Sequence, residues 1–136
     1  MNLSARLAQS IIPRIFLSLL FIYSGVGKLL AVDSTMNFIS ANGVPFPAIA
    51  FSVALVMELI VSTLVIVGYQ LRFSAGSLAI YSIATALMFH HGLSNQLQAI
   101  QFLKDVAIAG GFLQLAASKA CFPTAVNEHG PQRATS

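Results

Sequence analysis

Four long apolar segments constrain the fold of this 136-residue chain more than any other feature of its sequence. Each segment holds roughly 20 mostly apolar residues, which is the length that an α-helix needs to cross a bilayer. Only 8% of the residues are charged and 57% are hydrophobic, whereas a soluble domain carries about 25% charged residues. This composition excludes an ordinary water-soluble globule, and it excludes a disordered chain, which needs low hydrophobicity and high charge. We therefore predict an all-α integral membrane protein, a bundle of four transmembrane helices.

The apolar segments also set the expected boundaries. The predicted helices span about residues 11–32, 46–68, 73–92 and 100–118. Together they form a transmembrane domain over residues 1–120, and the polar residues 121–136 form a flexible cytoplasmic tail. The first segment is interpreted as a retained helix rather than a signal peptide, because no small-x-small cleavage site follows Leu30.

Helix-breaking residues mark the start of the first helix and the connections. Pro13 is expected in the first turn of the helix. The N–H groups of that turn have no intrahelical hydrogen-bond partner, so the missing N–H of proline costs no hydrogen bond there. Residues 33–45 include Asp, Asn, Gly and Pro, so we expect a loop there, with a short interfacial helix as the alternative. The link Tyr69–Arg72 is so short that the second and third helices must pack antiparallel.

The distribution of basic residues predicts the orientation. An even number of spans places both termini on one side, together with the link between the second and third helices. The simple basic anchors on that side are Arg6, Arg14, Arg72, Lys119 and Arg133. The opposite side holds only Lys28 and Lys104, both inside helices, so the positive-inside rule predicts cytoplasmic N- and C-termini.

Charge and cysteine content exclude several classes of partner and cofactor. The net charge is +3, but the basic residues form no cluster or stripe, so no nucleic-acid partner is expected. The single cysteine, Cys121, excludes an internal disulfide, a thiol redox couple and a cysteine-held haem or iron–sulfur cluster. No metal site is expected either, because the adjacent His90 and His91 diverge on a helix and His129 lies in the tail.

Glu58 interrupts the longest apolar segment and is the clearest candidate for a special role. It lies about 15–18 Å into a slab about 30 Å thick, close to the bilayer midplane. An ionisable group there costs about 2.5–3.5 kcal/mol, so it must face the bundle and find a partner or become neutral. Two interpretations stay open with equal weight: a functional carboxylate, and a structural brace between helices.

Lys28, Lys104 and Asp105 are the other charged residues of the spans on the outer side. Lys28 shares a small and polar helix face with Ser24, and the alternative for it is snorkelling to the headgroups. Lys104 and Asp105 lie about 100° apart on their helix, so they cannot both face one partner. We predict that Lys104 points inward and is the preferred partner of Glu58. Lys28 and Glu58 differ in depth by about 8–13 Å, a gap that water or a ligand would fill.

His90 and His91 end the third segment and are candidates for hydrogen bonding to a quinone or for carrying protons. The position of the two residues on the helix favours His91, which extends a stripe that contains Tyr81 and Met88. The alternative for both histidines is an interfacial belt at the membrane boundary.

Several segments, in their order and spacing, resemble the DoxX family of small four-helix bacterial inner-membrane proteins. These are Arg14 with Phe21–Lys28 (FIYSGVGK), Met57–Leu59 (MEL), Gly68–Arg72 (GYQLR), Phe89–His90 and Phe102–Gly111 (FLKDVAIAGG). Members are linked to membrane redox systems, including the small subunit of thiosulfate:quinone oxidoreductase. The resemblance implies an inner-membrane, redox-associated component, and it favours His90 over His91.

The combined prediction is a redox-associated, quinone-linked membrane component. Whether it takes part in catalysis stays open; any enzymatic activity would be that of a membrane oxidoreductase of which this chain is a subunit, not of a self-contained enzyme. Its polar pocket would be formed by Glu58, Lys104, Lys28, His90 and Asp105, with a quinone as the ligand. Compatible partners are the lipid bilayer, a membrane or soluble redox protein, and a second copy of the chain. The alternatives are a non-catalytic scaffold or assembly subunit and, ranked last, a permease for a small solute or protons.

Overall fold

The computed structural model describes residues 2–90 and 92–118, and within these ranges every regular element is a helix. Four helical spans there are long and apolar enough to cross a membrane: Leu3–Leu30, Pro47–Val67, Leu71–Phe89 and Gln96–Ala117. The predicted all-α membrane fold with four spanning helices is therefore confirmed. The expected tail at 121–136 lies outside the described residues, as does His91.

The first helix, α1 (Leu3–Leu30), begins well before the expected residue 11, so Pro13 lies inside it rather than in its first turn. No strong helix breaker precedes Pro13, and the helix extends back through the mixed polar and apolar residues 3–10. Arg14, expected to be a simple basic anchor, is instead buried, with 6% of its surface exposed. That expectation was wrong because Arg14 lies on the inward face of α1, in one stripe with the buried Ser18 and Phe21.

A short helix, α2 (Val32–Ala41), follows α1 and packs against α3 (Pro47–Leu55). The alternative of a short helix in this connection is thus confirmed. The chain reverses at Gly43, where φ is 76°, a left-handed conformation that glycine adopts without steric cost.

The second spanning helix contains an unexpected change of helix type. It consists of α3, the π-helical segment η1 (Val56–Val61) and α4 (Ser62–Val67). In a π-helix the backbone bonds to the residue five positions earlier, which widens the turn. The Ser62 hydroxyl follows the same pattern and donates to the Met57 carbonyl oxygen at 3.3 Å. Glu58 lies within η1 and is buried.

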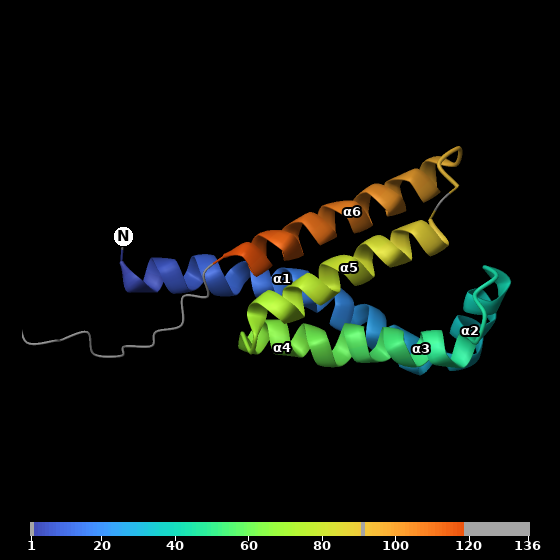
Figure 1. The fold of residues 1–136 in the computed structure, drawn as a ribbon, viewed down its shortest axis with the longest axis horizontal. Helices are drawn as coiled ribbons and strands as arrows, with labels where there is room; N and C mark the ends of the chain where they lie inside the picture. Colours follow the sequence, from blue (N-terminus) through green and yellow to red (C-terminus); the bar gives the residue numbers. More distant parts are fainter. Residues whose placement is uncertain (1, 91, 119–136) are drawn as a thin grey trace, which may run out of the picture.

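The link between α4 and α5 (Leu71–Phe89) is tight, as predicted, although α5 already begins at Leu71. Gly68 ends α4 with a φ of 84°, and the Tyr69 N–H donates to the Leu64 carbonyl at 3.0 Å, which satisfies a carbonyl at the helix end. Gln70 also has a positive φ, 42°. The result is the expected antiparallel contact between α4 and α5 (Figure 1).

The last helix, α6 (Gln96–Ala117), lies beside α5 and forms the most extensive helix contact of the bundle (Figure 1). Its N-terminus is capped by Asn95, whose side-chain oxygen accepts from the Leu97 N–H at 3.0 Å. The core beneath includes Phe112 and Leu78, both fully buried. The rings of Phe21 and Phe112 meet edge to face at 5.5 Å, which joins α1 to α6.

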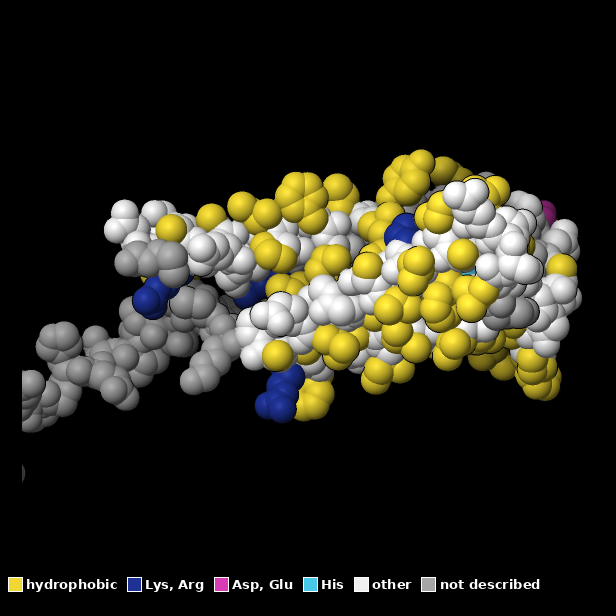
Figure 2. Space-filling model, turned by 90° about the horizontal axis from the view of Figure 1, so that it is seen from above, with side chains coloured by type: hydrophobic (Ala, Val, Ile, Leu, Met, Phe, Trp, Pro, Cys, Tyr) yellow, Lys and Arg dark blue, Asp and Glu magenta, His cyan; other side chains and the backbone are white. Residues whose placement is uncertain are grey.

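The bundle is not packed equally tightly along its length. α3 contacts α1 and α2 but makes no close backbone approach to α5 or α6, so the α5–α6 hairpin diverges from α1 and α3 toward the end that carries α2 (Figure 1). Many large hydrophobic side chains are exposed on the outside of the helices, and the face seen in Figure 2 has few charged side chains among the described residues. Where the helices diverge, the inside of the bundle contains a cavity, whereas its outer surface faces lipid.

Candidate functional site

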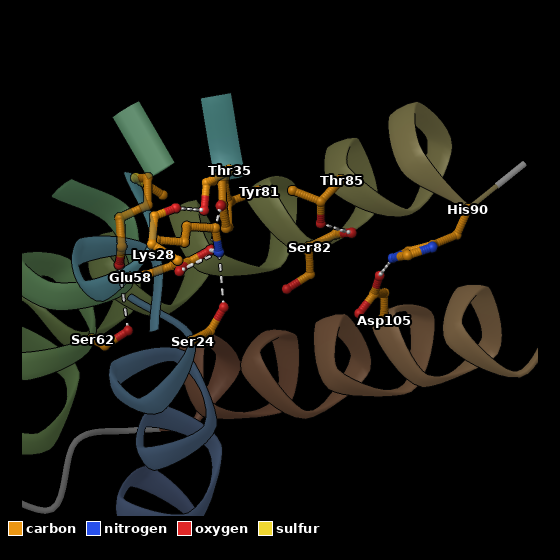
Figure 3. Close-up of polar contacts among 12 residues, drawn as sticks. Ser24, Lys28, Thr35, Glu58, Ser62, Tyr81, Ser82, Thr85, His90 and Asp105 are labelled. Atoms are coloured by element: carbon orange, nitrogen blue, oxygen red, sulfur yellow. Dashed lines mark hydrogen bonds and ion pairs between the residues drawn. The ribbon is translucent and has the colours of Figure 1, made fainter. Parts of the chain in front are cut away.

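Lys28 and Glu58 form a direct ion pair between α1 and η1 (Figure 3). The Lys28 ammonium donates to both carboxylate oxygens of Glu58, at 2.6 and 2.7 Å. Glu58 is buried, with 3% of its surface exposed. The carboxylate therefore faces the bundle and has a cationic partner, which a charge at this depth requires.

Two further contacts complete the network around this pair. Lys28 also donates to the Ser24 hydroxyl at 2.8 Å, one turn earlier on α1. The Tyr81 hydroxyl, from α5, donates to Glu58 Oε1 at 2.7 Å. A buried ion pair is tolerated only when its remaining donors and acceptors are satisfied, and all three protons of the Lys28 ammonium have an acceptor here. The network thus connects α1, η1 and α5.

The prediction that Lys104 is the partner of Glu58 was wrong. Lys104 is exposed on α6, and its ammonium donates to the side-chain oxygen of Gln101 on the same helix. Lys28 bridges the estimated difference in depth because its long, flexible side chain extends toward Glu58, while the carboxylate extends from the widened turn of η1. No ligand or water is needed between the two groups.

Asp105, rather than Lys104, is the inward member of its pair. Its carboxylate lies 3.7 Å from His90 Nε2, and both side chains are visible beside the α5–α6 hairpin in Figure 3. On the other side of the ring, His90 Nδ1 lies 3.2 Å from the side-chain oxygen of Gln98. His90 therefore has a hydrogen-bond partner at Nδ1 and a nearby carboxylate beside Nε2, both from α6. The competing candidate His91 lies outside the described residues.

The Lys28–Glu58–Tyr81 network and the His90–Asp105 pair border the same cavity, which has a volume of about 310 Å³. Glu58, Lys28 and Tyr81 line one part of it, and His90, Asp105 and Lys104 line another, so all five predicted site residues border it. Most of the remaining wall is apolar and comes from Leu20, Phe21, Phe38, Ile39, Ala54 and Met88. At the wall between α2 and α5, the rings of Phe38 and Phe89 stack at 5.5 Å.

The cavity lies where the helices diverge. Its walls come from α1, α2 and α3 on one side and from α5 and α6 on the other. The backbones of α3 and α5 make no close contact, and side chains from both helices line the cavity between them.

Comparison with known proteins identifies the family. The profile of the DoxX family matches residues 10–91, more than half of the chain. The chain belongs to the DoxX family. The matched region includes Lys28, Glu58, Tyr81 and His90, whereas Asp105 and Lys104 lie beyond it.

Two curated relatives of this DoxX protein come from Escherichia coli K12. Inner membrane protein YphA is 35% identical over 118 residues, which cover 83% of this chain and 84% of YphA. Inner membrane protein YqjF is 29% identical over 106 residues, which cover 78% of this chain and 80% of YqjF. No solved structure matches. With its four apolar spans, this DoxX protein is a multi-pass inner membrane protein.

Sequence reasoning did not assign Tyr81 and Gln98 to the site. Tyr81 had been noted only as part of a helix stripe leading to His91. The available signal was the hydroxyl group itself, since a tyrosine within a membrane span needs a hydrogen-bond partner and Glu58 needs donors. Gln98 gave no such signal, because it lies in a polar connection where side chains reach water.

Proposed function

We propose that the cavity of this DoxX protein binds the head group of a membrane quinone, and that the protein is a component of a membrane redox system. The observation that carries this proposal is an apolar cavity bordered by the Lys28–Glu58–Tyr81 network and by the His90–Asp105 pair. Ligand sites combine mostly apolar walls with a few convergent polar groups, and this arrangement matches that description.

The polar groups suit quinone chemistry. A quinone has two carbonyl oxygens that accept hydrogen bonds, and its reduction to the quinol takes up two electrons and two protons. Lys28, Tyr81 and His90 carry N–H or O–H groups that border the cavity. Those of Lys28 and Tyr81 bond to Ser24 and Glu58 in the free protein, so a quinone oxygen would take the place of one of these acceptors. Glu58 and His90 are the residues that we assign to proton exchange with the bound head group. The electrons come from a partner protein, in the membrane or dissolved, that this proposal leaves unnamed.

The size of the cavity favours a head group over a whole lipid. A volume of about 310 Å³ is at the lower end of the roughly 300–1,000 Å³ of ligand sites. A quinone ring fits that space, and its isoprenoid tail would extend beyond the cavity. The mostly apolar wall supports a lipid-soluble ligand rather than a polar solute that crosses the bundle.

The test is the quinone content of the purified protein. Glu58→Gln keeps the shape of the side chain and removes its charge, and Tyr81→Phe removes only the hydroxyl group; Tyr69→Phe is the matched control, since Tyr69 is 58% exposed at the far end of α5. After gentle detergent extraction, mass spectrometry should find quinone in the wild type and in the control. The loss of a charged hydrogen-bond partner should weaken retention about tenfold or more. Equal quinone in all four proteins would contradict the proposal.

A non-catalytic scaffold is the second candidate function, and the ion pair itself favours it. Lys28 and Glu58 satisfy one another without any ligand, so the network alone could fix the register of α1, η1 and α5. In that case Glu58→Gln would lower the thermal stability, and no quinone would accompany the wild-type protein.

A further inference from the structure

A second buried charge lies outside the cavity, in the N-terminal half of α1. Arg14 is 6% exposed, and its Nη2 donates to the Ser10 hydroxyl at 2.6 Å, one turn earlier. Its Nε is also buried and makes no hydrogen bond within residues 2–90 and 92–118. The guanidinium group, with five N–H donors, is therefore only partly satisfied by this part of the chain.

No carboxylate of the described residues neutralises Arg14. Within residues 2–90 and 92–118 the acidic residues are Asp33, Glu58 and Asp105. Glu58 pairs with Lys28 and Asp105 lies beside His90, while Asp33 begins α2 at the opposite end of α1. A buried cation without an anion is costly, so an anion from outside these residues is the simplest way to balance it.

The position of Arg14 indicates where that anion lies. Gly25 lies level with Glu58, because a Cβ added to Gly25 would lie 3.2 Å from Glu58 Cβ. Arg14 precedes Gly25 by eleven residues, about 16 Å along the axis of α1. Half of the hydrocarbon core is about 15 Å thick, so with Glu58 near the midplane Arg14 reaches the headgroup layer. The N-terminal half of α1 lies on the side of the bundle where α4 and α6 end (Figure 1). Ser10 is half-buried there, so the pair of residues reaches the surface of the bundle.

We propose that Arg14 and Ser10 bind the phosphate group of an anionic phospholipid. A guanidinium group matches phosphate geometry through two parallel N–H···O bonds. The Ser10 hydroxyl, which accepts from Arg14, has its own proton free to donate to a phosphate oxygen. The exposed Arg6, two turns before Arg14, adds positive charge on the same side of the bundle. The site is independent of the quinone cavity, since it shares no residue with it.

Lipid-dependent thermal stability tests this proposal on the full-length protein in detergent. The additions are phosphatidylglycerol, phosphatidylcholine and inorganic phosphate, and the proteins are the wild type, Arg14→Gln, Arg14→Lys and Arg6→Gln. Arg6→Gln is the matched control, because it removes the same charge from the exposed surface of the same helix. We expect phosphatidylglycerol to raise the melting temperature of the wild type and of Arg6→Gln, with little effect of the other two additions.

Arg14→Gln should lose that increase, and native mass spectrometry should show its affinity for phosphatidylglycerol reduced about tenfold or more. Arg14→Lys should keep part of the increase in melting temperature, because the lysine ammonium keeps the positive charge but cannot form two parallel hydrogen bonds to a phosphate. If Arg14→Gln does not fold, the proposal is tested by Arg14→Lys, which should show a smaller increase in melting temperature with phosphatidylglycerol than Arg6→Gln does. The proposal is overturned if the Arg14 variants respond to phosphatidylglycerol as Arg6→Gln does, or if inorganic phosphate alone gives the full increase.

Discussion

At the scale of single residues, the Lys28–Glu58 pair makes the bundle sensitive to the loss of either charge. Lys28→Met would leave the buried Glu58 carboxylate with only the Tyr81 hydroxyl as a partner. Removing one member of a buried pair costs about 3–5 kcal/mol, whereas replacing both members with uncharged groups is often nearly neutral. We therefore expect Lys28→Met to lower the free energy of unfolding by that amount and Lys28→Met/Glu58→Gln to restore most of it.

Denaturant unfolding in detergent, followed by circular dichroism, measures this effect. Lys104→Met is the control, because Lys104 is exposed and bonds only within α6. A loss in Lys28→Met no larger than in Lys104→Met would show that the pair does not stabilise the fold.

The sequence allowed part of this network to be predicted. A carboxylate in the middle of an apolar span must face the bundle, so the inward orientation of Glu58 follows from its position alone. The choice between Lys28 and Lys104 did not follow, because it depends on side-chain reach and on the tilt of α1 against η1, which depth estimates for straight helices omit. Asp105 was misplaced for a related reason: the angular separation of adjacent residues shows that one of them faces inward but not which one.

At the scale of helices, the approach of α1 to η1 depends on Gly25. A Cβ added there would lie 2.8 Å from Leu59 Cδ2 and 3.2 Å from Glu58 Cβ, whereas one added at Gly27 would meet nothing within 4 Å. Gly25→Ala therefore forces the Leu59 side chain to move, or the two helices to separate beside the ion pair, at a cost of about 1–3 kcal/mol. Gly27→Ala should be neutral or slightly stabilising, because alanine is the better helix former.

Thermal unfolding of the two variants and the wild type measures this difference, and quinone content reports whether the neighbouring cavity changes with it. Equal melting temperatures for Gly25→Ala and Gly27→Ala would contradict the close approach.

The helices themselves were the most predictable level of the structure. The four apolar segments became the four spans, because their length and composition leave no other way to satisfy the backbone in a bilayer. The π-helical turn of η1 was not predictable, since a single charged residue, Glu58, in an apolar run does not indicate a change of helix type, and the shift in backbone hydrogen bonding leaves no mark in composition. The early start of α1 was missed because residues 3–10 mix polar and apolar side chains and lie outside the apolar run that set the boundary.

At the scale of the whole molecule, the cavity and the headgroup site lie toward opposite ends of the bundle, so their roles depend on the orientation of the protein in the membrane. With cytoplasmic termini, α2 and the His90 end of the cavity face the periplasm, and Arg14 lies near the cytoplasmic leaflet. The exposed Arg6 and Arg72 on the terminal side support this orientation through the positive-inside rule.

Cysteine labelling in intact cells tests the orientation. In a Cys121→Ser background, Ser40→Cys places a thiol at an exposed position of α2, and Tyr69→Cys places one at the exposed link between α4 and α5. We expect a membrane-impermeant maleimide to label Ser40→Cys in intact cells and Tyr69→Cys only after permeabilisation. Labelling of Tyr69→Cys in intact cells, and of Ser40→Cys only after permeabilisation, would show that the cavity faces the cytoplasm. Protons exchanged at His90 would then come from the cytoplasm, and the redox partner would lie on that side. Labelling of both positions in intact cells would mean that the span Pro47–Val67 does not cross the membrane. That result would contradict the even number of crossings from which the orientation of the cavity and of Arg14 is inferred.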